Sequence, residues 1–223
     1  MADQHDRDQD TQPGVLDADS EAAPAAPEES DFRIVAIGAS AGGIEAASRL
    51  LGALPRDFPA AVLLVLHRTP DSSSQLARVI AFKSALPVEI AQEGTVLRHG
   101  VCYIAPTHGH LTIVPELTIH LLANGFYRGN SIDMLFSSLA RCAGPRTIGV
   151  VLSGMLKDGA LGLKAIKDAG GAGLVQEPAE AIFPDMPRNA IATDGAIDFV
   201  GPVEMLAQEI CRRVGLASAA VTG

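Results

Sequence analysis

Three short apolar runs constrain the fold of this chain more than any other feature. They are RIVAIG (residues 33–38), AAVLLVL (60–66) and TIGVVLSG (147–154). Continuous apolar runs of this length are typical of strands buried on both faces, as in a parallel sheet covered by helices. A segment with helical periodicity follows each run, beginning with Ile44, Ala47, Leu51 and Leu54. The alternation predicts an α/β fold: a doubly wound, mainly parallel sheet with helices on both faces.

The same patterns predict the remaining elements. Further helices are expected from Asp71 to about Ala81, around residues 132–139, over residues 159–169 and over residues 203–214. Short strands are expected at VCYIAP, GLVQ and AIDFV, and a short turn is expected to begin at Pro187. The segment LTIVPELTIHLL predicts a short β-hairpin that turns at Pro115 and Glu116.

Acidic residues are concentrated at the N-terminus. Residues 1–31 contain ten acids and one arginine, which accounts for the net charge of -9, and the rest of the chain carries 16 acids and 16 bases. We therefore expect a disordered acidic tail at 1–31, one domain at 32–215 and a flexible C-terminus at 216–223. The tail has no apolar core typical of a secretory signal. A domain without net charge gives no indication of nucleic-acid binding.

Cysteine content and hydropathy indicate the compartment. Cys102, Cys142 and Cys211 are odd in number and widely spaced, so we expect buried thiols in a reducing environment rather than disulfides or a metal cluster. No run approaches the roughly 18 apolar residues that a membrane span requires. These features predict a cytoplasmic protein without membrane insertion.

The glycine-rich turn GASAGG after the first apolar run fits two chemistries. One is dinucleotide binding, in which the glycines approach a phosphate at a helix N-terminus. However, Ser40 stands where the second glycine of G-x-G-x-x-G is needed, and the next predicted strand ends in His67 rather than an acid that could bind a ribose. Neither tyrosine, Tyr103 or Tyr127, begins the Tyr-x-x-x-Lys pair of short-chain dehydrogenases. The nucleotide hypothesis is therefore the weaker one.

The other chemistry is nucleophilic catalysis. Gly38, Ser40 and Gly42 fit the G-x-S-x-G pattern, which exposes a serine between a strand and a helix. A serine nucleophile needs a general base and an orienting carboxylate. His67 and Asp158 follow the second and third buried runs, so both are expected at the edge where Ser40 lies. Alone, Ser40 and Asp158 read as helix caps and His67 as a loop histidine, but together they indicate a catalytic triad.

Several longer segments resemble the catalytic domain of chemotaxis protein-glutamate methylesterases, the CheB-type family. The resemblance covers about residues 32–210 and is carried by IGASAGGIEA, LPRDFPAAVLLVLHRTP, LRHGVCYIAPTHGHL, SIDMLFSSLA, VVLSGMLKDGALGL and VQEPAEAIFPDMPRNAI. It implies Ser40 as nucleophile, His67 as base and Asp158 as the orienting carboxylate. It also implies an oxyanion site near the backbone of Ala41 and Met155, no cofactor or metal, and methyl esters of glutamates on the cytoplasmic helices of methyl-accepting chemotaxis receptors as substrate.

The chain departs from the family pattern beside the expected triad. Ala41 replaces the usual threonine, Leu66 the usual glutamine before the histidine, and Leu156 a frequent glycine. Arg68 and Thr69 replace an apolar pair, and the usual Arg-Pro before SID is missing. Family members usually carry a receiver domain, for which the acidic tail is too short, so we expect an esterase that its own receiver does not regulate.

Other groups of residues could also form sites. His108 and His110, with His67 and Asp158, could form a metallohydrolase site, although no further ligand is nearby in the sequence and loop histidines are the simpler interpretation. Arg188 and the region of Arg128 could bind an acidic substrate, with surface charge as the simpler interpretation. A regulatory module that kept the fold, in another sensory pathway, remains the alternative to an enzyme.

Overall fold

The computed structural model describes residues 32–67, 73–123 and 129–216, and a seven-stranded sheet forms its centre. Its strands are β1 (Arg33–Ala39), β2 (Ala60–Leu66), β3 (Val88–Ile90), β4 (Cys102–Ile104), β7 (Thr147–Val151), β8 (Ala172–Gln176) and β9 (Phe199–Gly201). The strand order is β3-β4-β2-β1-β7-β8-β9, and every pair is parallel. The predicted doubly wound parallel sheet is confirmed.

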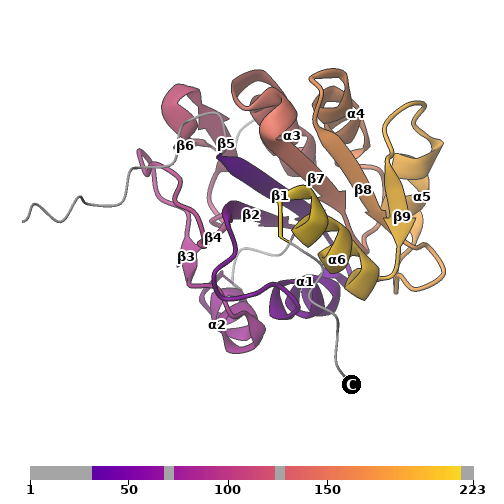
Figure 1. The fold of residues 1–223 in the computed structure, drawn as a ribbon, viewed down its shortest axis with the longest axis horizontal. Coiled ribbons are helices and arrows are strands. Elements are labelled where there is room, and N and C mark those ends of the chain that lie inside the picture. Colours follow the sequence, from indigo (N-terminus) through magenta and orange to yellow (C-terminus); the bar gives the residue numbers. More distant parts are fainter. Residues whose placement is uncertain (1–31, 68–72, 124–128, 217–223) are drawn as a thin grey trace, which may run out of the picture.

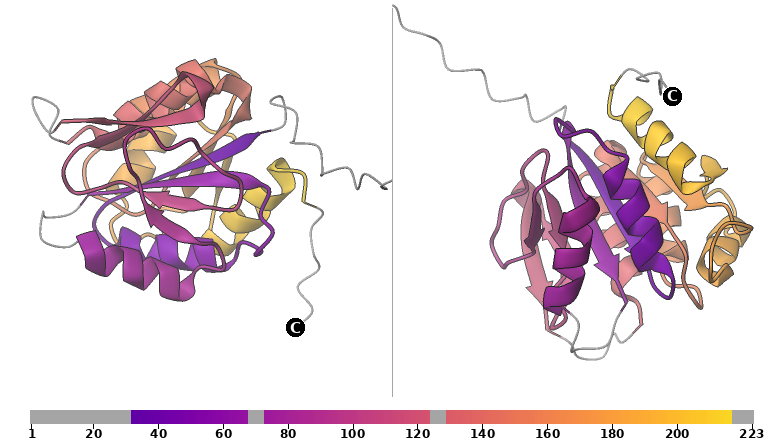
Figure 2. Two further views of the ribbon diagram at one scale, coloured as in Figure 1. Left: turned by 90° about the vertical axis from the view of Figure 1, so that its left-hand side faces the viewer. Right: turned by 90° about the horizontal axis from the view of Figure 1, so that it is seen from below.

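Helices cover both faces of this sheet (Figures 1 and 2). On one face lie α1 (Gly43–Gly52), α2 (Ser73–Lys83) and α6 (Val203–Arg213), and on the other lie α3 (Ser131–Cys142), α4 (Ala160–Asp168) and α5 (Asp185–Ala192). The predicted hairpin is confirmed as the antiparallel pair β5 (His110–Val114) and β6 (Thr118–Leu122), which packs against α3. Two short 3₁₀ turns, Pro115–Leu117 and Gly144–Arg146, precede β6 and β7.

Burial explains why the strands are continuously apolar. Every residue of β2 and of β7 is buried, because side chains on both faces of the sheet meet a helical layer. Alternate residues of β1 enter two separate cores: Val35 and Ile37 pack towards α1 and α6, whereas Ile34 and Ala36 pack towards α3 and α4. A residue just beyond the end of β1 is therefore expected to point to one core if its number is odd and to the other if its number is even.

Two local predictions are corrected, and one strand was not predicted. The turn expected at Pro187 is the helix α5, in which proline is tolerated because the N–H groups of a first helical turn have no partner within the helix. The edge strand β3 was not predicted, because its three residues are only partly buried and lack an apolar run. Ile44, expected on the buried face of α1, is 44% exposed.

Other predictions concern parts of the chain that the structure does not describe. The acidic tail (1–31), almost all of the C-terminal segment (216–223), Asp71 and Arg128 lie outside the described residues. Among the helices that are described, none has the length and apolar character needed to cross a membrane.

Candidate active site

Ser40 and His67 follow the ends of neighbouring strands. In the pairing of β1 with β2, Ala39 is the partner of Leu66, and these are the last paired residues. The backbone continues this pairing by one more hydrogen bond, from the N–H of His67 to the carbonyl of Ala39 over 3.1 Å. Ser40 and His67 are thus the next residues beyond one registered pair, at the carboxyl edge of the sheet.

The two side chains leave the sheet on the side of α3 and α4. Residues of β1 alternate between the two cores, and Gly38 lies two positions before Ser40 on the α3 side, where a Cβ atom would approach Cγ2 of Ile132 to 2.3 Å. Only glycine at this position lets the first turn of α3 come this close to β1. By the same alternation in β2, His67 shares the side of Val65, which packs in the α3 core.

Asp158 completes the group from the loop between β7 and α4. Its carboxylate is 3% exposed, and its Oδ2 lies 2.8 Å from Nε2 of His67. The ring N–H does not point along this contact, so in this conformation the two groups lie close together without a hydrogen bond. The carboxylate itself is fixed by two backbone donors at the N-terminus of α3, Ile132 and Asp133, each over 2.9 Å. It is not the cap of its own helix, since Gly159 occupies that position.

A second carboxylate makes the reciprocal contact. Oδ1 of Asp133 accepts hydrogen bonds from the N–H groups of Gly159 (3.0 Å) and Gly162 (2.6 Å) at the start of α4. The helices approach closely because a Cβ atom on Gly162 would lie 2.6 Å from Cβ of Phe136. Burial raises the pKa of the Asp133 carboxyl, and the charge of Asp158 adds to the shift. Each helix therefore receives a carboxylate from the other at its positive end.

The turn that carries Ser40 is held by its backbone and by Ser153. Gly42 has a φ of 72°, a left-handed conformation that favours glycine. The hydroxyl of Ser153 donates to the carbonyl of Ala41 over 2.8 Å and accepts from the N–H of Phe183 over 3.0 Å. The N–H of Ser40 donates to the carbonyl of Ser153 over 3.0 Å. Ser40 is not a helix cap, because Gly42 occupies that position without a side-chain hydrogen bond.

The Ser40 hydroxyl has no hydrogen bond to another described residue, His67 included. The backbone N–H groups of Ala41 and Met155 likewise have no acceptor in the described part of the chain. Both therefore remain available as donors to a bound group. The side chain of Met155 is 50% exposed and is not part of the core.

A polar chain extends from this turn to the far side of α1. The N–H of Ser153 donates to Oε1 of Gln176 over 2.8 Å, and the Gln176 amide donates to Glu180 over 3.1 Å. Glu180 in turn binds Arg49 over 2.7 Å, and Arg49 also binds Glu204 of α6. A cavity of about 130 Å³ lies along this chain, bordered by Gly42, Ser153, Gln176 and Glu180 among others. Gln176, which is 2% exposed, was not singled out from the sequence.

His110 was expected in a turn, but it lies in a strand beside the His67–Asp158 pair. It is the first residue of β5, is 5% exposed, and its Nδ1 lies 2.9 Å from the hydroxyl of Ser131. Burial lowers the pKa of His110, His67 lowers it further, and Asp158 opposes the shift. The histidine therefore belongs to the surroundings of the candidate site.

The other candidates are not brought together. Across residues 32–67, 73–123 and 129–216, no three His, Cys, Asp or Glu side chains are placed to hold a metal ion. Arg188 is an exposed residue of α5. All three cysteines are free, but only Cys102 is fully buried, so the prediction of three buried thiols is wrong for Cys142 and Cys211.

A protein-family model matches most of this chain. The family model described as CheB methylesterase matches residues 35–210, well over half of the chain. The chain belongs to the CheB methylesterase family. The fold agrees: the crystal structure of the Thermotoga maritima CheB methylesterase catalytic domain superposes with a TM-score of 0.75 at 28% identity, covering 81% of this chain and 98% of that one.

Curated relatives of this CheB-family chain carry related names. A protein-glutamate methylesterase/protein-glutamine glutaminase 2 of Methanosarcina mazei is 39% identical over 190 residues, covering 81% of this chain and 52% of that protein. The protein-glutamate methylesterase FrzG of Myxococcus xanthus is 38% identical over 167 residues, covering 74% of this chain and 50% of that protein. The chain thus spans about half the length of the curated relatives it matches.

Proposed function

We propose that this chain is a serine hydrolase that removes methyl esters from glutamate side chains of methyl-accepting chemotaxis receptors in the cytoplasm. The observation that carries the proposal is the buried Asp158 carboxylate, 2.8 Å from Nε2 of a His67 that follows the strand next to Ser40. A carboxylate, an imidazole and a serine hydroxyl are the three groups that acyl transfer by a serine enzyme needs. The names of the relatives support the same chemistry and the same substrate class.

In the proposed mechanism, Ser40 attacks the ester carbonyl while His67 accepts the serine proton. Nε2 faces Asp158, so Nδ1 is the nitrogen that serves the serine and then protonates the leaving methanol. Asp158 holds the imidazole in one tautomer and stabilises the imidazolium. Water, deprotonated by His67, then cleaves the glutamyl-serine ester, which releases the glutamate and regenerates Ser40.

The developing negative charge requires donors that point to the ester oxygen. We assign this role to the backbone N–H groups of Ala41 and Met155. The assignment is supported because neither N–H donates to an acceptor in the described part of the chain. The positive end of α1, which begins at Gly43, adds to this field. In comparable sites, one such donor is worth about 2.7–4 kcal/mol of transition-state stabilisation. The chemistry uses no metal or cofactor.

Specific observations favour two other candidate functions. The name of the Methanosarcina relative includes a glutaminase, and the same groups could hydrolyse a glutamine amide, with ammonia in place of methanol. A regulatory module without turnover is the other candidate, because the Ser40 hydroxyl and His67 are not hydrogen-bonded and because Ala41, Leu66 and Leu156 depart from the family pattern.

The experiment measures methanol release from methylated receptor membranes by wild type, Ser40→Ala and Ser48→Ala. Ser48 is the control: it is a buried serine of the adjoining α1, and its hydroxyl bonds only the Ile44 carbonyl of its own helix. We expect Ser40→Ala to lose about 10³-fold or more in turnover, and Ser48→Ala to keep wild-type turnover. Equal methanol release by wild type and Ser40→Ala would refute the mechanism. Ammonia release from receptor glutamines would indicate the glutaminase activity. Absence of Ser40 labelling by a fluorophosphonate would favour the regulatory module.

A further inference from the structure

Leu156 is an apolar side chain in an unfavourable and exposed position. Its φ of 66° is left-handed, a conformation in which a branched side chain is a genuine outlier. The side chain is nevertheless 75% exposed, so burial within the described structure does not offset the backbone strain. Strain of this kind concentrates at functional sites.

Neighbouring elements impose this conformation. The carbonyl of Leu156 accepts a hydrogen bond from Nδ2 of Asn189 over 2.8 Å, and the same amide donates to the carbonyl of Asp185 over 2.9 Å. The loop before Leu156 is bound to α5 as well, since the N–H of Met186 donates to the carbonyl of Gly154 over 2.9 Å. The leucine is therefore held outward by a fixed backbone.

Leu156 belongs to the loop that approaches the proposed nucleophile. A Cβ atom on Gly154, two residues earlier, would lie 2.8 Å from Cβ of Ser40, and Asp158 is two residues later. Three other exposed apolar side chains border the same turn, and together with Leu156 they form what we call the apolar rim: Met155, Leu156, Ile182 and Phe183. Ile182 and Phe183 lie against Gly42 of the Ser40 turn.

We propose that Leu156 is a specificity-determining residue that contacts an apolar side chain of the protein substrate beside the esterified glutamate. This inference rests on the proposed function. On a helical substrate, the side chains three and four positions from the glutamate lie about 5–6 Å from it and reach the surface around the nucleophile together with the ester. Burial of the exposed leucine then occurs only in the complex, and the fixed backbone keeps it in place for that contact.

The test compares Leu156→Ala, Leu156→Gly and Leu156→Met with wild type on methylated receptor membranes and on the small ester p-nitrophenyl acetate. Ala removes the side chain and keeps the strain, Gly removes both, and Met keeps an apolar side chain of similar size. We expect Ala and Gly to raise KM for receptor about ten-fold, with kcat and the small-ester kcat/KM unchanged, and Met to restore KM. Leu156→Gly should also melt above wild type, because glycine relieves the strain.

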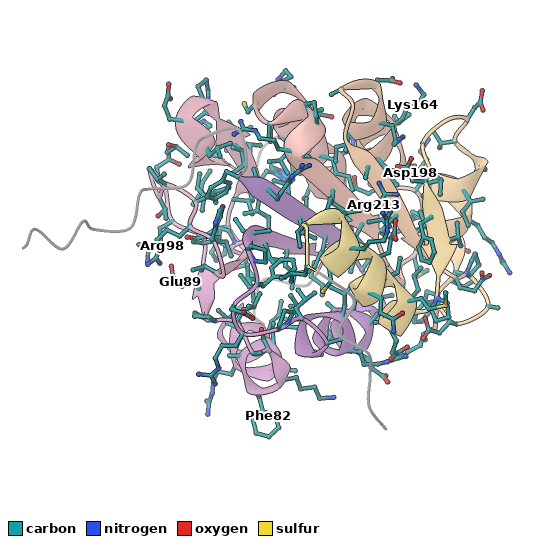
Figure 3. All side chains as sticks on the ribbon, viewed as in Figure 1. Phe82, Glu89, Arg98, Lys164, Asp198 and Arg213 are labelled. Carbon is teal, nitrogen blue, oxygen red and sulfur yellow. The ribbon has the colours of Figure 1, made fainter. Side chains whose placement is uncertain are left out.

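Phe82→Ala is the matched control for losing an exposed apolar side chain. Phe82 is 89% exposed and projects from α2, on the opposite face of the sheet from α3 and α4 (Figure 3). It should keep the wild-type KM. Wild-type KM in both Leu156→Ala and Leu156→Gly would overturn the inference, as would an equal loss on the small ester, which would mean that Leu156 acts through the site itself. Absence of methanol release from the wild type would instead refute the proposed function.

Discussion

Asp158 and Asp133 carry the carboxylates at the N-termini of α3 and α4. Their substitutions separate a catalytic contribution from a structural one. Asp158 and Asp133 each accept two backbone N–H groups from the opposite helix, but only Asp158 also contacts His67. Replacing Asp158 by asparagine keeps the shape, leaves one acceptor oxygen and places an NH₂ group against the second donor. Replacing Asp133 by asparagine keeps one oxygen for both of its donors and removes only the charge. Asp158→Asn should therefore lose more stability than Asp133→Asn, and the two variants should also differ in activity.

The magnitudes follow from the bonds that are lost. One charge-assisted hydrogen bond is worth about 1.5–3 kcal/mol, and the loss of a charge at a helix N-terminus adds about 0.3–1 kcal/mol. Asp158→Asn should thus lower the free energy of unfolding by about 2–4 kcal/mol, and Asp133→Asn, which loses only the charge, by about 0.3–1 kcal/mol. For activity, the same replacement in serine-protease triads lowers kcat by about 10⁴-fold, because the histidine takes the wrong tautomer. We expect a loss of this order for Asp158→Asn, and a smaller loss for Asp133→Asn, because only Asp158 contacts His67.

The assay pairs urea denaturation with methanol release, and normalises kcat to the folded fraction at the assay temperature. The reasoning is refuted if Asp133→Asn loses kcat to the same extent as Asp158→Asn, because the carboxylates would then act as one unit. It is equally refuted if Asp158→Asn keeps wild-type turnover.

Two further predictions concern the surroundings of the site. Gly42→Ala should lower the free energy of unfolding by about 1–2 kcal/mol and reduce turnover, since its Cβ would lie 2.8 Å from Oγ of Ser153 at a φ of 72°; unchanged urea denaturation and methanol release would contradict this. His110 has a lowered pKa in the folded state, with Ser131, His67 and Asp158 as its polar neighbours, so its neutral form contributes stability above about pH 6.5 that is lost as the pH falls. Urea denaturation at pH 7.5 and 5.5 should show a smaller pH dependence for His110→Asn than for wild type, and equal dependence would contradict the assignment.

The fold was predictable where burial left a continuous pattern. Apart from Arg33 and Thr147 at their starts, strands β1, β2 and β7 are apolar and buried on both faces, so they could be read without a structure. Strand β3 is a partly buried edge of three residues, and α5 contains Pro187, so in both cases the local sequence resembles a loop. Proline in a first helical turn is compatible with the helix, but the sequence alone does not show where that turn begins.

The candidate site divides in the same way. The positions of Ser40 and His67 follow from strand ends alone, because parallel strands end at one edge of the sheet. The contact of Asp158 with α3 does not follow from local pattern, since its hydrogen bonds join residues 26 and 25 positions apart through the close packing of α3 on α4. Asp133, Ser153 and Gln176 were missed for this reason: each acts through a partner that only the folded chain brings near. The catalytic roles themselves stay predictions.

The central position of β1 has a consequence for folding. Its two neighbours, β2 and β7, are joined to it by parallel pairs, and every parallel pair requires a long crossover to close. The pair with β2 closes a short stretch of chain, whereas β7 lies more than a hundred residues from β1, so its pairing carries the larger cost in chain entropy. A chain that has formed only the first crossover holds a serine and a histidine without their carboxylate. The loop that bears Asp158 therefore reaches the edge that holds Ser40 and His67 only when β7 pairs with β1.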